Sequence, residues 1–290
     1  MNAIAKPVLL PVTGDHGLDA AIPYAAAQAN LRRSGVHLVH VMHPGIGPGD
    51  SVELRLLDGE LRQVSADLLE RTADAVRKFV DEDVPVSTEL VHGLVVPALV
   101  ECSKEADLVV LQHRRRSVIT RVASHSVTTG LAARAHAPVV SVPEFWQPGL
   151  GPVVVGVEDP QSSYEVVRLG LHEARLAGSA ARLVQCWWIS QMYDDIVFGD
   201  RSGVEHSNRL HHHLETDLAP LLEEFAEVPV QLVVTHQPPA DALVGESRHA
   251  SLVVVGRHHP SMPLGSHLGS IARTVVREGK CPVLVVEPRA

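Results

Sequence analysis

The chain has few aromatic residues, few cysteines and no excess of positive charge. Phe, Trp and Tyr make up 3% of its 290 residues, so a hydrophobic core has to be built from Ala, Val and Leu. Such a composition is typical of parallel strands buried beneath helices. The formal net charge of −9 argues against a general nucleic-acid-binding protein, because phosphate binding needs a cationic surface.

The three cysteines, Cys102, Cys186 and Cys281, are far apart and lie in or beside apolar segments. We expect buried, reduced thiols there rather than a disulfide or a metal site. The short apolar run near the N-terminus predicts a strand rather than a signal peptide. No run approaches the roughly 18 apolar residues that a membrane span needs. We therefore expect a cytoplasmic protein that binds neither membranes nor nucleic acid.

Short apolar runs alternate with helix-length segments along the whole chain. In the first half, helices are expected at about residues 18–33 and 60–80, and strands at 7–12, 36–41, 84–91, 108–111 and 139–142. In the second half, the expected strands are 153–157, 181–186, 228–234, 252–255 and 283–286. This alternation predicts right-handed β-α-β units and a parallel sheet.

An internal repeat defines the expected domains. ADLVVLQ at 106–112 matches ASLVVVG at 250–256, and APVVSVPE at 137–144 matches CPVLVVEP at 281–288. The offset is the same for both pairs, since 256 − 112 and 281 − 137 are both 144. We predict two tandem doubly wound α/β domains, 1–145 and 152–290, each a five-stranded parallel sheet with helices on both faces. The Gly- and Pro-rich segment FWQPGLGP between them is the expected linker.

The segment from Gly256 to Ser270, GRHHPSMPLGSHLGS, follows a strand and opens a helix. Glycines allow the backbone to approach an anion closely, and the first turn of a helix offers free N–H groups. Ser270 adds a hydroxyl donor. The carboxyl edge of a parallel sheet is the usual place for a phosphate in such folds, although many glycine-rich turns are only turns.

This loop resembles the universal stress protein signature, Gly-x2-Gly-x9-Gly-Ser/Thr. Gly256, Gly269 and Ser270 match it in register, and His259 stands where the second glycine is expected. VVVGVEDPQSS at 153–163 resembles the opening strand of the family, with Glu158 in place of its aspartate. VQCWW at 184–188 resembles the second strand. The resemblance covers nearly the whole chain, in two copies.

The resemblance implies an adenine-nucleotide site in the second domain, with ATP, possibly with Mg²⁺, as the ligand. The phosphates would lie on the glycine loop, and Glu158 would reach toward the ribose or the base. The implied ligand-contact residues are Val157, Glu158, Gly256, His259, Gly265, Gly269 and Ser270. The family also implies that the final strands of the two copies meet, which would make the chain an internal pseudo-dimer able to associate further. Its protein partner is not implied.

The first copy departs further from the signature. Gln112, Arg115 and His125 replace all three glycines, and Ser126 alone matches. Thr13 takes the acidic position, with Asp15 close by. The arginines 114–116 could attract phosphate, but a solvated surface is the expected role of such a short run. We therefore expect one nucleotide-binding copy and one copy that serves mainly as scaffold.

Three functions remain open from the sequence. The leading one is a nucleotide-responsive stress protein that binds ATP without efficient turnover. The alternatives are an interaction scaffold that binds no nucleotide, and a slow ATPase, for which no base or water-positioning residue stands out. No GxSxG motif is present, and the neighbours Ser124-His125 and Ser266-His267 do not provide the geometry of a catalytic triad.

Two weaker groups of residues accompany the loop. The histidines 206 and 211–213 predict a surface helix rather than a zinc site, whereas His258, His259 and His267 could make ligand binding sensitive to pH. The aromatic cluster after the second strand of domain 2 could form a lid, a protein contact or ordinary core; its members are Trp187, Trp188, Met192, Tyr193 and Phe198.

Overall fold

The computed structural model describes residues 5–13, 18–42, 52–113, 121–188, 200–257 and 268–287. The chain divides into two compact units, Met1–Phe145 and Trp146–Ala290. All ten strands expected from the apolar runs are present among the described residues, at nearly the expected positions. None of the helices in the described ranges is long and apolar enough to cross a membrane.

Unit 1 contains a parallel sheet in the order β3-β2-β1-β4-β5. Its strands are β1 (Val8–Pro11), β2 (Val36–Met42), β3 (Val86–His92), β4 (Leu108–His113) and β5 (Val139–Pro143). Its helices are α1 (Ala21–Arg32), α2 (Val52–Arg77), α3 (Val95–Cys102) and α4 (Arg121–Arg134), with the short 3₁₀ helix η1 (Ser103–Glu105) after α3. Helix α2 begins eight residues before the start predicted from the sequence, at 52 rather than 60.

Unit 2 repeats this arrangement in the order β8-β7-β6-β9-β10. Its strands are β6 (Val153–Val157), β7 (Ala181–Trp187), β8 (Val230–His236), β9 (Leu252–Gly256) and β10 (Val283–Val286). The helices are α5 (Tyr164–Ala177), α7 (Asp200–Glu224), α8 (Pro239–Glu246) and α9 (Ser270–Glu278). The predicted fold class is therefore confirmed in each unit.

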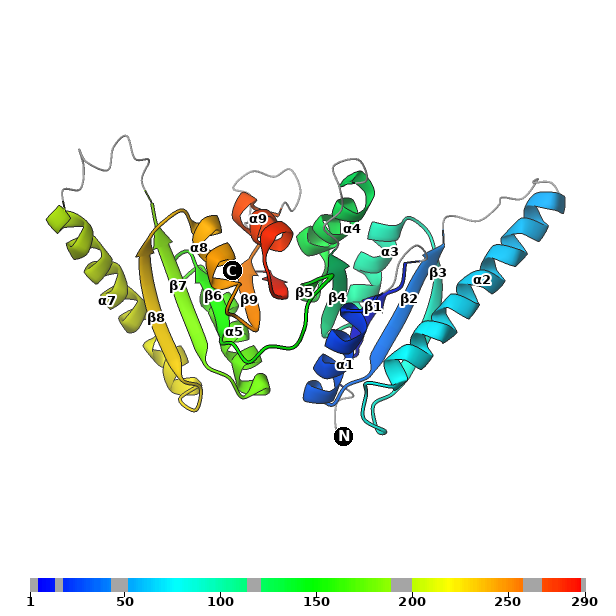
Figure 1. The fold of residues 1–290 in the computed structure, drawn as a ribbon, viewed down its shortest axis with the longest axis horizontal. Helices are drawn as coiled ribbons and strands as arrows, with labels where there is room; N and C mark the ends of the chain where they lie inside the picture. Colours follow the sequence, from blue (N-terminus) through cyan, green and yellow to red (C-terminus); the bar gives the residue numbers. More distant parts are fainter. Residues whose placement is uncertain are drawn as a thin grey trace. The chain divides into compact units, whose positions relative to one another are not determined.

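The central strands are fully covered because helices pack on both faces of each sheet. In unit 2, β6 and β9 are almost entirely buried valine and leucine. Helix α5 lies so close to β6 that a Cβ added to Gly170 would come within 2.3 Å of the Val155 side chain. Figure 1 shows the long helices α2 and α7 running along the outer strands β3 and β8.

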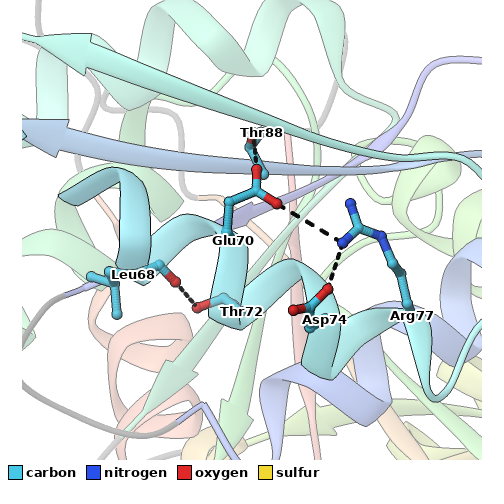
Figure 2. Close-up of polar contacts among 6 residues, drawn as sticks. All are labelled: Leu68, Glu70, Thr72, Asp74, Arg77 and Thr88. Carbon is cyan, nitrogen blue, oxygen red and sulfur yellow. Dashed lines mark hydrogen bonds and ion pairs between the residues drawn. The ribbon is translucent and has the colours of Figure 1, made fainter. Parts of the chain in front are cut away.

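Polar contacts hold α2 against the outer strand β3 (Figure 2). The Thr88 hydroxyl donates to Glu70 at 3.5 Å, and the same carboxylate faces the Arg77 guanidinium at 4.0 Å. Arg77 also contacts Asp74 at 2.7 Å on its own helix. These groups are largely exposed, so their main effect is to orient the helix and they add little stability.

A buried serine repeats at one place in both units. Ser103 Oγ accepts a hydrogen bond from His136 N–H, and Ser247 Oγ accepts one from Lys280 N–H. Each hydroxyl also donates to a carbonyl three residues earlier, of Val100 or Val244. The serine thereby joins the end of one helix to the segment that enters the last strand, which explains why this part of the repeat is so regular.

Candidate functional site

The candidate site of unit 2 lies where β6, β7 and β9 end. The helices that follow β6 and β9 start at this carboxyl edge, so the first amides of α5 and α9 are directed toward it. Val157 and Gly256 are the last residues of their strands, and Gly269 and Ser270 lie at the start of α9. His259 and Gly265 lie outside the described residues.

The turn after β6 is fixed by its own polar groups. The Asp159 carboxylate accepts hydrogen bonds from the backbone N–H groups of Gln161 and Ser162, at 3.0 and 3.1 Å. Ser163 Oγ accepts from Glu158 N–H at 3.1 Å and therefore does not cap α5, which it precedes. The Glu158 carboxylate is exposed at the edge of the sheet, free to reach a ligand.

Gln185 is a site residue that the sequence analysis missed. Its side chain is buried at the end of β7, and its Nε2 donates to the Glu158 carbonyl at 3.2 Å. Because a carbonyl can only accept, this bond fixes the orientation of the amide. The other atom, Oε1, is buried and accepts no hydrogen bond from the described chain. An unsatisfied buried acceptor of this kind is unusual and indicates a missing donor from a ligand or water.

Gly256 leaves space beside α5. A Cβ at this position would lie 3.2 Å from Val166 Cγ2, so a side chain would extend along the start of α5. The backbone φ angles here and at Gly269 do not require glycine. The amides of Glu165 and Val166, in the first turn of α5, make no hydrogen bond within the described part of the chain.

The next residue, Arg257, is a buried cation at the same edge. It is 7% exposed. Since successive strand residues point to opposite faces, it lies on the face covered by α8 and α9. Burial lowers the pKa of its guanidinium, and the charge of Glu287 opposes this shift. An arginine remains protonated under such conditions, so this end of the unit 2 sheet contains a buried positive charge.

Unit 1 differs at the corresponding place. Gln112 Oε1 accepts hydrogen bonds from the N–H groups of Ala20 and Ala21, at 3.0 and 3.1 Å. The amides at the start of α1 are therefore already satisfied by a side chain from β4. Thr13 is exposed at the end of β1, whereas Asp15 and the arginines 114–116 lie outside the described residues. The side chains of His125 and Ser126 are likewise not described.

The aromatic cluster is resolved in part. Trp187 stacks on His236 with ring centroids 3.8 Å apart, and His206 of α7 meets it edge-on at 4.9 Å. Its Nε1 donates to Ser207 at 3.0 Å, so Trp187 packs between β8 and α7. Trp188 is 51% exposed, and Met192, Tyr193 and Phe198 lie outside the described residues. The described residues contain no group of three or more possible metal ligands.

A separate hollow of about 520 Å³ opens at the other end of the unit 2 sheet. It is lined by residues 149–152, 177–182, 229–231 and Ser251. Those residues lie before or at the starts of the strands, whereas the candidate site lies where the strands end. The hollow therefore takes no part in the site described above.

Comparison with known proteins identifies both halves of the chain. The model of the universal stress protein family matches residues 5–143 and again 150–287. Universal stress protein Rv2005c of Mycobacterium tuberculosis is 30% identical over 291 residues, with 96% of each chain covered. A universal stress protein of Mycolicibacterium smegmatis is 28% identical over 301 residues, covering 99% of each. A solved universal stress protein from Archaeoglobus fulgidus has a TM-score of 0.72 at 14% identity, covering 98% of this chain and 99% of its own.

Proposed function

Because the chain belongs to the universal stress protein family, we propose that its second unit binds an adenine nucleotide, with ATP as the leading candidate. The bound nucleotide would act as a signal. The observation that carries the proposal is the contrast at one repeat position: Gln112 satisfies the first amides of α1, whereas Gly256 leaves those of α5 open.

The residues present fit such a ligand. The open amides of α5, together with the Arg257 charge, favour an anion at the carboxyl edge. Gly256, Gly269 and Ser270 would hold phosphates, and Val157 and Glu158 would lie beside the ribose or the base. The buried Oε1 of Gln185 needs a donor, which an amino or hydroxyl group of a nucleoside supplies. ATP itself would contribute the triphosphate charge and a site for Mg²⁺.

A binding protein of this kind signals through a change in population. If the nucleotide binds one conformation of the protein better than others, it enriches that conformation, and a partner can recognise it. The extent of the shift is limited by the difference in affinity between the two conformations.

Equilibrium titration of the full chain with ATP and Mg²⁺, followed by calorimetry, tests the proposal. We expect saturable binding at one site per chain, lost when Gly269 is replaced by Leu and retained when His125, its counterpart in unit 1, is replaced by Leu. ADP, AMP, cAMP and dAMP complete the ligand series, since solved universal stress proteins include complexes with cAMP and dAMP. Absence of binding by the unaltered chain would reject the proposal.

The second candidate is an interaction scaffold that binds no nucleotide. The blocked position at Gln112 favours this role for unit 1, whose α1 amides are occupied by its own side chain. A third possibility, slow ATP hydrolysis, is separated from binding by measuring phosphate release at saturating ATP. Release faster than that of a Gly269→Leu variant would favour the ATPase.

A further inference from the structure

Three polar side chains form a continuous hydrogen-bonded chain on the outer strands of unit 1. His37 of β2 lies beside Ser87 of β3, its partner in the strand register. Its Nδ1 is 2.9 Å from Ser87 Oγ, and its Nε2 is 3.0 Å from Glu89 Oε2. Ser87 and Glu89 are two residues apart on one strand and therefore project from the same face. The sequence pattern did not indicate this group, because His37 is 50 residues away from Ser87 along the chain.

The hydrogen bonds determine where the protons lie. The Glu89 carboxylate can only accept, so the Nε2 atom of His37 must carry a hydrogen. In the neutral imidazole, Nδ1 then holds a lone pair, and it faces the Ser87 hydroxyl. In this neutral form, the hydroxyl donates to His37 Nδ1. A serine whose proton is already directed at an imidazole, itself oriented by a carboxylate, has the arrangement of an activated nucleophile.

The group is accessible from solvent. Ser87 is exposed, and the side chains of His37 and Glu89 are 24% and 53% exposed. Cys102, the last residue of α3, is another nucleophile, and its thiol feels the charge of Glu89. Burial, and then the charge of Glu89, raise the pKa of the Cys102 thiol. Cys102 therefore stays protonated at neutral pH, and Ser87 is the more available group.

We propose that Ser87 is a nucleophile that becomes acylated by activated acyl esters, with His37 as its general base and Glu89 as a positioning residue. Ser87 Oγ attacks the carbonyl carbon, and its proton passes to His37 Nδ1. The new Oγ–C bond forms as the bond from that carbon to the leaving oxygen breaks. The alcohol or phenol leaves with the proton, and water later releases the acid and restores the hydroxyl.

Unit 2 provides a natural comparison. The positions that correspond to His37 and Ser87 are Arg182 and Gln231, which are also register partners. Arg182 donates to Gln231 Oε1 at 2.5 Å and pairs with Glu246 at 2.9 Å. A polar pair thus recurs at this place in both units, but unit 2 has neither hydroxyl nor imidazole there. A purely structural pair is the competing explanation, and it predicts no reactivity at Ser87.

Reaction of the full chain with p-nitrophenyl acetate tests the proposal. We expect a burst of p-nitrophenolate and one acetyl group on Ser87, located by peptide mass spectrometry. Ser87→Ala removes the burst, and His37→Gln slows acetylation by about 100-fold or more, the usual size of a general-base effect. Ser179→Ala is the matched control, since that hydroxyl bonds only a backbone carbonyl, and it leaves the rate unchanged.

The role of Glu89 is tested by the rate of Ser87 acetylation in Glu89 variants that remain folded. Glu89→Gln should slow acetylation about tenfold, and Glu89→Asp should recover part of the loss. Circular dichroism and thermal melting of each variant exclude unfolding as the cause. Acetyl groups found on lysines instead of Ser87, or a His37→Gln variant that reacts at the original rate, would overturn the proposal and leave a structural pair.

Discussion

At the end of the fourth strand of its unit, Gln112 occupies a place that Gly256 leaves open. The two strands are otherwise alike: both are buried, both pair with the first and fifth strands of their unit, and both lead toward a helix. A single side chain therefore separates a sheet edge whose helix amides are satisfied from one whose amides remain available. Duplication preserved the architecture, while the availability of the first helix amides differs with the side chain at this one position.

The two units also differ in charge at the residue that follows Gln112 or Gly256. His113 ends β4 and Arg257 follows β9, and both are buried. An imidazole can be neutral, whereas a guanidinium carries its charge throughout the accessible pH range. Unit 2 thus has a permanently charged group directly after β9, where unit 1 has an imidazole at the end of β4. The difference teaches that loss of a glycine signature can be compensated locally, here by a side-chain cap.

The largest effect is expected from placing the unit 1 residue in unit 2. Gly256→Gln should insert an amide oxygen at the start of α5, as Gln112 does at α1, and compete with the nucleotide. Loss of two charge-assisted hydrogen bonds predicts at least about 100-fold weaker ATP binding by calorimetry. Gly256→Ala is the control: its Cβ would lie 3.2 Å from Val166 Cγ2, a close contact that a small shift of the Val166 side chain relieves, so affinity should change a few-fold. Equal affinities for Gly256→Gln and the unaltered chain would refute this account of the site.

The reverse change should destabilise unit 1. Gln112→Ala leaves the N–H groups of Ala20 and Ala21 without their acceptor, at an expected cost of about 1–2 kcal/mol, as for a lost helix cap. Hydrogen exchange of peptides from α1 measures this locally in the full chain. Gln112→Glu keeps an acceptor and adds a charge favourable at a helix start, so it should retain protection. Faster exchange in both variants would mean that the cap is not the cause.

Much of this comparison was predictable from the sequence. The apolar runs and the 144-residue repeat predicted the strands and the fold, and the matched glycines distinguished the two copies, while the nucleotide site inferred from those glycines stays a prediction. Two features escaped prediction. In the sequence, Gln185 looked like an ordinary strand residue. It stands out only in the folded chain, where its Oε1 atom is buried and accepts no hydrogen bond from the described residues. Gln112 was recognised as a lost glycine, but its cap depends on the distance from β4 to the start of α1, which no local pattern encodes.

A third test concerns the start of the last strand, where Ala137 of unit 1 is matched by Cys281 of unit 2. Burial raises the pKa of the Cys281 thiol to about 12, above its value in an unfolded chain of about 8.5. The folded state therefore holds the thiol proton more tightly than the unfolded chain does. The buried Cys281 thiol contributes its full stability below about pH 8.5, and this contribution is lost as the pH rises toward 12. Unfolding free energy should fall with a slope of up to about 1.4 kcal/mol per pH unit in this window.

Cys281→Ala should remove that part of the slope, which urea unfolding at pH 8 and pH 10 can measure. The difference between the two chains isolates the thiol from lysines and tyrosines that titrate in both. Cys102→Ala serves as the control, because its thiol is only partly buried and its effect should be smaller. Parallel pH profiles for Cys281→Ala and the unaltered chain would show that this thiol is hydrated in solution.

The smallest effect is expected at the end of the first helix of each unit. Arg33 follows α1 with φ 50°, and Gly178 follows α5 with φ 60°, so both adopt the left-handed conformation. A side chain is strained there and glycine is not, so Arg33→Gly should stabilise unit 1 by about 0.5–1 kcal/mol. Gly178→Ala should cost unit 2 about 1 kcal/mol although its Cβ would meet nothing within 4 Å. Arg33→Ala separates backbone strain from charge: it removes the guanidinium but keeps the strain, so hydrogen exchange in α1 should remain as in the unaltered chain.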